Sequence, residues 1–183
     1  INGDGFDDVI VGAWGADPNG ELSGSSYVVF GKASGFNAAM NLSDLDGNNG
    51  FRLDGVSAYA RLGLSVSNAG DVNGDGFDDV IVGAFGADPN NGELSGSSYV
   101  VFGKASGFNA TMNLSVLDGS NGFRLDGEAA GDMSGISVSN AGDVNGDGFD
   151  DVIVGAAGAD PNGNSSGSSY VVFGKASGFS ATL

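Results

Sequence analysis

The sequence contains no cysteine and no histidine among its 183 residues. Without cysteine the fold has no disulfide to stabilise it, and the redox compartment cannot be inferred from cysteine usage. Without histidine the protein lacks the commonest general base and the imidazole ligands of many metal sites. Only 6 residues are basic and 23 are acidic, which gives a formal net charge of -17. A surface of this charge repels nucleic acid and anionic membranes, so we expect neither as a partner.

Long apolar runs are also missing from the sequence. No run approaches the roughly 20 residues that cross a bilayer, so we expect no membrane insertion. Hydrophobic residues still make up 40% of the chain, in short compact segments. This content argues for a folded domain rather than for disorder.

The most prominent positive feature is an internal repeat. Asp4, Asp75 and Asp147 occupy equivalent positions, which are 71 and 72 residues apart. The second unit is longer by one asparagine, in the turn-rich segment 88–92. The repeat units cover approximately residues 1–61, 62–133 and 134–183. A period of this length is typical of proteins built from stacked supersecondary units.

Each unit contains segments with the residue patterns of strands. In the second unit these segments are residues 64–69, 80–84, 98–103 and 122–127, and Leu114 and Leu117 anchor a longer connection before the last one. The middle two are apolar on both faces, so each sheet must be covered on both sides. We therefore predict an all-β fold of β-propeller blades, each a four-stranded antiparallel sheet. A linear stack of sheets or an irregular sandwich is the alternative.

The phase of the strands predicts three partial blades in this chain. The first unit lacks its opening strand, and the third stops before its fourth, which leaves three, four and three strands. Three blades are fewer than the four to eight that close a ring. We therefore expect either a fragment of a longer protein or an assembling subunit. Further blades from the parent chain, or from other copies, would complete the ring.

An acidic nine-residue loop follows the first strand of each complete unit. Residues 71–79 and 143–151 have the same sequence, Asp-Val-Asn-Gly-Asp-Gly-Phe-Asp-Asp, and residues 1–8 form an incomplete third copy. Four carboxylates and one amide oxygen without a basic neighbour suit a hard divalent cation such as Ca²⁺. Val82 and Val154 occupy the position where an EF-hand needs glutamate, which excludes that motif. The alternative is an acidic turn that binds no metal.

This loop and its flanks resemble the FG-GAP repeat. The upstream element is Leu62–Val66, and the downstream glycine-alanine element begins at Gly12, Gly83 and Gly155. The FG-GAP repeat builds the seven-bladed propeller in the head of integrin α chains, and it occurs in many bacterial surface and secreted proteins. The resemblance covers the chain in three units. The upstream FG element departs from the family pattern, reading Leu62-Gly63 in one unit and Ser134-Gly135 in the next.

The resemblance implies that each loop joins the first and second strands of a blade and holds one calcium ion. Two full sites and one partial site are implied. The implied ligands are the side chains of Asp71, Asn73, Asp75 and Asp79 with the carbonyl of Phe77; the side chains of Asp143, Asn145, Asp147 and Asp151 with the carbonyl of Phe149; and, in the partial site, Asn2, Asp4, Asp8 and the carbonyl of Phe6.

These features favour a calcium-binding, calcium-stabilised structural or adhesive module of a secreted or cell-surface protein. Its partner would be a protein or glycan ligand at loops at the ends of the blades, such as 56–62 and 128–134. The alternative is a lectin-like propeller in which Trp14 or Tyr59 stacks on a sugar. We expect no enzymatic activity, because the metal accounts for the dense aspartate clusters and no nucleophile–base pair with histidine or cysteine exists.

The remaining charged residues are expected on the surface. Asp78 and Asp150 lie between the implied ligands and should point outward. The segment 88–90 could host a second ion, although an ordinary turn is the expectation. The arginines at 52 and 124 and the lysines at 32, 104 and 175 are expected to pair with surface carboxylates.

Overall fold

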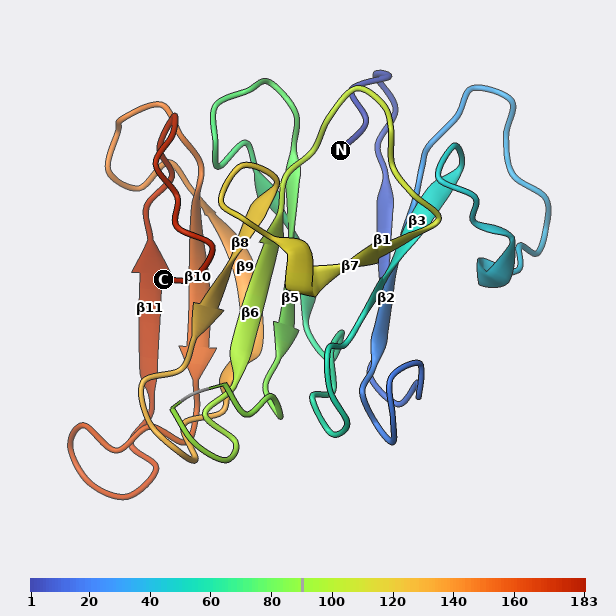
Figure 1. Cartoon of the computed structure of the whole chain (residues 1–183). Helices are drawn as coiled ribbons and strands as arrows, with labels where there is room; N and C mark the ends of the chain where they lie inside the picture. Colours follow the sequence, from blue (N-terminus) through green and yellow to red (C-terminus); the bar gives the residue numbers. More distant parts are fainter. Residues whose placement is uncertain (90) are drawn as a thin grey trace.

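The structure is a computed structural model that describes residues 1–89 and 91–183. Within these residues, eleven strands form three sheets that stand side by side (Figure 1). The strands are β1 (Val9–Ala13), β2 (Ser25–Val29), β3 (Gly50–Asp54), β4 (Val66–Gly70), β5 (Asp79–Ala84), β6 (Ser97–Val101), β7 (Thr111–Asn113), β8 (Gly122–Asp126), β9 (Ser134–Gly142), β10 (Asp151–Ala156) and β11 (Ser168–Val172). Two 3₁₀ turns, η1 (Leu42–Asp44) and η2 (Leu114–Val116), lie in the long connections. Asn90, the extra residue of the second unit, lies outside the described residues.

Each sheet corresponds to one repeat unit. The complete sheet has the order β4-β5-β6-β8 with antiparallel pairing, and its neighbours contain β1-β2-β3 and β9-β10-β11. Every residue of β5 and of β6 is buried, as expected for strands covered on both faces. The ten strands expected from the sequence are therefore present, and the prediction of stacked antiparallel blades is confirmed.

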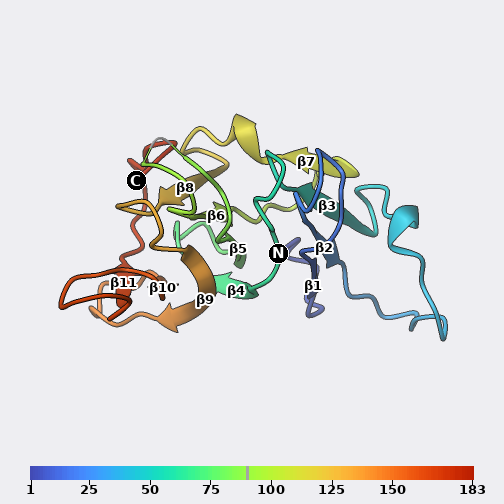
Figure 2. The ribbon, with the colours of Figure 1, turned by 90° about the horizontal axis from the view of Figure 1, so that it is seen from below.

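An eleventh strand, β7, lies in the connection between β6 and β8. It pairs in parallel with β3 of the preceding sheet, with Leu53 opposite Met112 (Figure 2). The third unit repeats this arrangement with a parallel bridge between Thr182 and Arg124. Sequence patterns missed this strand because it is only three residues long and its partner belongs to another unit. Each long connection therefore reaches back over the preceding blade.

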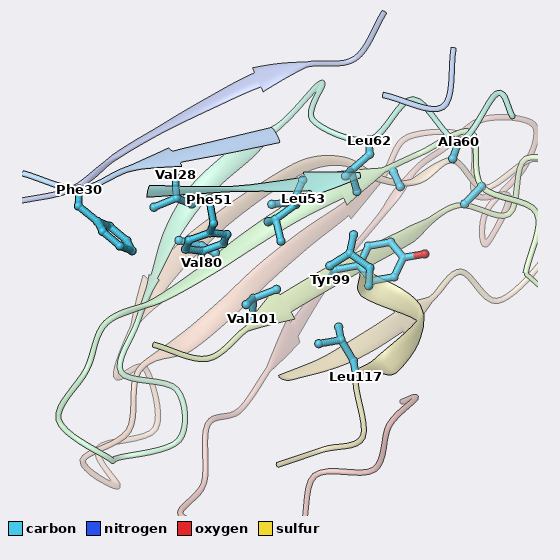
Figure 3. Close-up of a cluster of buried hydrophobic side chains, with 14 residues drawn as sticks. Val28, Phe30, Phe51, Leu53, Ala60, Leu62, Val80, Tyr99, Val101 and Leu117 are labelled. Atoms are coloured by element: carbon cyan, nitrogen blue, oxygen red, sulfur yellow. The ribbon is translucent and has the colours of Figure 1, made fainter. Parts of the chain in front are cut away.

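The cores lie between adjacent sheets. Residues from the first and second units form one cluster, which contains Phe51, Val101 and Leu117 (Figure 3). The predicted anchors Leu114 and Leu117 are both buried here. Where the first unit meets the second, a Cβ at Gly12 would overlap the Gly63 carbonyl, so glycine is required for this packing.

Aromatic residues from the long connections fasten each blade to the one before. Phe108 stacks on Phe51 of the preceding sheet, with ring centroids 4.7 Å apart, and meets Phe30 edge-on at 5.3 Å. Phe179 repeats this contact on Phe123, with a centroid separation of 4.6 Å. Because these rings bridge two units, they stabilise the blade–blade interface directly.

The basic residues do not all behave as expected. Arg52 binds Asp54 at 2.8 Å, and Arg124 makes the equivalent 2.7 Å bond to Asp126, so both arginines pair with carboxylates as predicted. These carboxylates are not on the surface, because Asp54 is buried and Asp126 is half-buried. The lysines instead lie over aromatic rings: the lysine nitrogens of Lys32, Lys104 and Lys175 are 5.0, 5.0 and 4.8 Å from the ring centroids of Phe36, Phe108 and Phe179. The four-residue spacing within each Lys-Ala-Ser-Gly-Phe turn explains this cation–π contact.

Candidate cation-binding loops

The three acidic loops lie at the same end of the stacked sheets. Residues 71–79 connect β4 to β5, and residues 143–151 connect β9 to β10, at the upper edge in Figure 1. The loops turn sharply at glycines with positive φ, which are Gly74 and Gly76 in one loop and Gly146 and Gly148 in the other. Such a turn needs the left-handed backbone that glycine adopts without strain.

The first three implied ligands of loop 71–79 converge on one turn. Oδ1 of Asp71 and Oδ1 of Asn73 both accept a hydrogen bond from the Asp75 backbone nitrogen, each at 3.0 Å. The Asn73 amide nitrogen donates to Asp75 Oδ2 at 2.9 Å, and the Phe77 backbone nitrogen donates to Asp75 Oδ1 at 2.9 Å. The three side chains therefore meet around the Asp75 amide.

Loop 143–151 repeats this geometry. Asp143 Oδ1 and Asn145 Oδ1 accept from the Asp147 nitrogen at 3.0 and 2.9 Å, and the Phe149 nitrogen donates to Asp147 at 3.0 Å. Identical sequences thus adopt the same local hydrogen-bond pattern in two different blades, as expected for a turn whose conformation is set by its own side chains.

The last aspartate of each loop has a different role from the others. Asp79 is fully buried, and its oxygens accept from the backbone nitrogens of Val72 at 3.0 Å and Gly103 at 2.8 Å. Asp151 makes the equivalent bonds to Val144 and Gly174, each at 2.9 Å. This carboxylate therefore ties the loop to the end of the third strand of its own blade.

Burial raises the pKa of Asp79 to about 7, although the N–H donors of Gly103 and Val72 favour its charged form. The negative charges of Asp75 and Asp71 add to this rise in pKa. The three carboxylates thus lie within electrostatic reach of one another, and a cation placed among them would oppose the shift.

The incomplete first loop has the same turn. Asn2 Oδ1 accepts from the Asp4 nitrogen at 3.2 Å, and Asp4 Oδ1 accepts from the Phe6 nitrogen at 2.9 Å. Asp8 accepts from the Gly31 nitrogen at 2.8 Å, as Asp79 does from Gly103. All four implied residues of the partial site are therefore placed as in the complete loops.

The residues fit calcium in the chemistry of their donors. Each complete loop offers carboxylate and amide oxygens, which are the ligands that calcium prefers. Across residues 1–89 and 91–183, however, no three acidic side chains converge into a group that would hold a metal ion as they stand. The oxygens point instead to backbone N–H groups of the turn. Cation binding would require these oxygens to exchange N–H donors for the ion.

The expectation that Asp150 points outward is wrong. Its Oδ2 accepts a hydrogen bond from the backbone nitrogen of Asp71, in the preceding loop, at 2.9 Å. Asp78, at the equivalent position, is exposed and accepts from the Asn68 side chain at 3.3 Å. No sequence pattern indicated this difference, because the partner of Asp150 lies in another repeat unit.

Two exposed aromatic residues, Trp14 and Tyr59, lie at the opposite end of the blades. Trp14 follows β1 and is 46% exposed, and Tyr59 follows β3 and is 50% exposed. The Tyr59 hydroxyl donates to the Glu21 carboxylate. Phe85, the equivalent of Trp14, lies beneath the Arg61 guanidinium at 5.2 Å. Trp14 is therefore the more accessible of the two equivalent rings.

Comparisons with known proteins place these features in a family. A family model described as FG-GAP repeat matches residues 62–101 and 134–172, which include both complete loops. Integrin alpha-4 of Xenopus laevis is 32% identical over 157 residues, which are 85% of this chain and 13% of the relative. Integrin alpha-V of Gallus gallus is 32% identical over 167 residues, which are 87% of this chain and 14% of the relative.

The matches cover a small part of the relatives. The chain spans 13–14% of the length of these two curated relatives. Within the described ranges, no helix is long and apolar enough to cross a membrane. The chain belongs to the FG-GAP repeat family, and its sheets are β-propeller blades of the integrin α-chain type.

Proposed function

We propose that the chain is a calcium-stabilised blade segment of a β-propeller, in a secreted or cell-surface protein that serves as a structural or adhesive interaction module. The observation that carries the proposal is the acidic loop, present in two complete copies with one sequence and one hydrogen-bond pattern. The named relatives are integrin α chains, which supports an adhesive role. No enzymatic activity is part of the proposal.

The proposed ligands are those implied by the sequence, in two complete sites and one partial site. Calcium supplies positive charge among carboxylates that otherwise repel one another. Asp71, Asn73 and Asp75 would hold the ion on one side of the turn, while Asp79 anchors the loop to its blade. At an affinity of about 0.1 mM, typical of extracellular modules, about 1 mM calcium stabilises the fold by about 1.4 kcal/mol per site.

Thermal unfolding in calcium and in excess chelator tests the proposal. We expect the Tm to fall on chelation, and Asp75→Ala or Asp147→Ala to lower the calcium-dependent part of the Tm. Asp46→Ala is a matched control, because Asp46 accepts a similar backbone bond from Asn48 at 2.8 Å outside the loops. An identical Tm for the unmodified protein in calcium and in chelator would contradict the proposal.

Completion of the ring is a second part of the proposal. The units 1–61, 62–133 and 134–183 are proposed as three successive blades, with further blades supplied by the parent chain or by other copies. Native mass spectrometry tests whether other copies of the chain supply the further blades, because copies that complete a ring form an oligomer of defined mass. A stable monomer that neither assembles nor continues into further blades would contradict this part.

Ligand binding is proposed at the end of the blades opposite the acidic loops. A protein ligand is favoured by the integrin relatives, while the exposed Trp14 ring supports a glycan as the second candidate. A glycan array in calcium, with Trp14→Ala as the comparison, tests the second candidate. Absence of binding to every glycan, or equal binding by the variant, would remove it.

A further inference from the structure

The two complete loops share one sequence but have different neighbours. We call residues 71–79 the covered loop, because residues of the next blade pack on it. We call residues 143–151 the open loop, because no later loop packs on it within the described chain. Val72 of the covered loop is 0% exposed, while Val144 of the open loop is 56% exposed. Within the described residues, only the first of these two complete loops is contacted by a following unit.

Asp150 of the open loop makes the first contact between the two loops. Its Oδ2 accepts from the Asp71 nitrogen at 2.9 Å, and its own nitrogen donates to the Asp71 carbonyl at 3.2 Å. A Cβ at Gly70 would overlap the Asp150 carboxylate, so this side chain packs directly against the backbone there. The backbone of Asp71, the first proposed ligand of the covered loop, is thus held from both sides by Asp150.

Two further contacts act on the next residues of the covered loop. The Phe149 ring lies against Gly74, where a Cβ would overlap it. The backbone nitrogen of Lys175 donates to the Val72 carbonyl at 3.0 Å. Contacts from the following blade therefore hold the covered loop at Asp71, Val72 and Gly74.

We infer that Asp150 is a positioning residue for the cation site of the covered loop. The inference rests on the proposed calcium-binding function. A loop that is already held in place loses less conformational freedom when it binds an ion, so it binds the ion more tightly.

Calcium titration of the isotope-labelled chain, followed by NMR, tests this positioning role site by site. The backbone amides of Gly76 and Gly148 report on the covered and open loops separately. We expect the calcium affinity of the covered loop to depend on Asp150 by about five-fold, within the usual range of interaction between sites. Asp150→Ala should raise the covered-loop midpoint about five-fold and change the open-loop midpoint less than two-fold.

Two other variants distinguish a positioning role of Asp150 from an effect of its charge and from misfolding. Asp78→Ala removes the equivalent negative charge from the covered loop itself. If charge alone matters, Asp78→Ala should lower the calcium affinity of the covered loop at least as much as Asp150→Ala does. If Asp150 acts by positioning, Asp78→Ala should lower that affinity less. Asp150→Asn keeps an oxygen acceptor and should restore most of the lost affinity. If Asp150→Ala does not fold, Asp150→Asn should still shift the covered-loop midpoint by more than the open-loop midpoint.

The possible failures are distinguishable. If both amides respond to calcium but Asp150→Ala leaves the covered-loop midpoint unchanged, the positioning role is wrong and the proposed function stands. A larger effect of Asp78→Ala than of Asp150→Ala also overturns the positioning role. If neither amide responds at millimolar calcium, the proposed function itself fails.

Discussion

The covered and open loops have the same environment at their last residue and different environments at their second residue. Their last residues, Asp79 and Asp151, are both fully buried and make the same two backbone hydrogen bonds. Their second residues differ completely, because Val72 is buried beneath the next blade and Val144 is exposed. The anchor of each loop thus depends on its own blade, whereas the environment of the ligand-bearing turn depends on the following one.

The Lys-Ala-Ser-Gly-Phe segment shows the same contrast. Phe108 packs into the preceding blade, and its equivalent Phe36 is 54% exposed. In both cases the residues of one unit do not determine their own burial. Repeat proteins derive much of their stability from contacts between neighbouring units, and these two segments identify where such contacts lie.

The largest expected effect is the loss of an aromatic contact between blades. Phe108→Ala removes a ring stacked on Phe51, and we expect it to lower the free energy of unfolding by about 3 kcal/mol. Phe36→Ala, the same change in the exposed copy, should cost less than about 0.5 kcal/mol. Urea unfolding measures both. Equal costs would show that the stacking does not stabilise the interface.

The anchor aspartates should behave alike in the two loops. Asp79→Ala leaves the backbone nitrogens of Val72 and Gly103 without their acceptor, and we expect a loss of about 2 kcal/mol. Asp151→Ala should cost a similar amount, because its bonds are equivalent. Urea unfolding in chelator isolates this effect from cation binding. A cost confined to one variant would contradict the conclusion that the anchor acts within its own blade.

Alanine substitution of the equivalent glycines should cost more stability in the covered loop than in the open loop. Alanine at Gly74 or Gly146 is strained by a positive φ of 72° or 76°. At Gly74 the new Cβ would also overlap the Phe149 ring, whereas nothing lies within 4 Å at Gly146. We therefore expect Gly74→Ala to destabilise the protein by about 1 kcal/mol more than Gly146→Ala, measured in chelator. A larger cost at Gly146 would contradict the assignment of the covered loop.

The last expected effect is a pH dependence from Asp79. Its folded-state pKa of about 7 lies above the value of about 3.9 in the unfolded chain, so protonation favours the folded state. The resulting stabilisation is present below about pH 4 and is lost as the pH rises through 7. In chelator we expect the Tm to fall by a few degrees between pH 5 and 8. Asp79→Asn should reduce this fall, and an unchanged pH profile in the variant would exclude Asp79 as its source.

The sequence was sufficient to predict ten of the eleven strands and the sharp turns of the acidic loops. Apolar runs such as residues 80–84 are long enough to specify buried strands, and the glycines of the acidic loops specify sharp turns. The anchors Leu114 and Leu117 were also predictable, because two leucines in a polar connection need a core to pack in.

The contacts between units were not predictable in the same way. The pairing of β7 with β3 joins residues about 60 positions apart, and no local pattern encodes it. Asp150 was assigned to the surface because it lies between implied ligands of its own loop, whereas its hydrogen-bond partner lies 79 residues away. The lysines were assigned to carboxylates by charge alone, whereas Lys104 lies over the ring of Phe108, four residues later in the sequence.

The central claim is that calcium binds the two complete acidic loops. A crystal structure of the chain grown in calcium, with an anomalous difference map, tests it most directly. The account predicts one ion in each loop, 2.3 to 2.6 Å from oxygens of Asp71, Asn73 and Asp75 in one and of Asp143, Asn145 and Asp147 in the other. Side chains that remain turned to the backbone N–H groups in both loops, with no anomalous peak beside them, would contradict it.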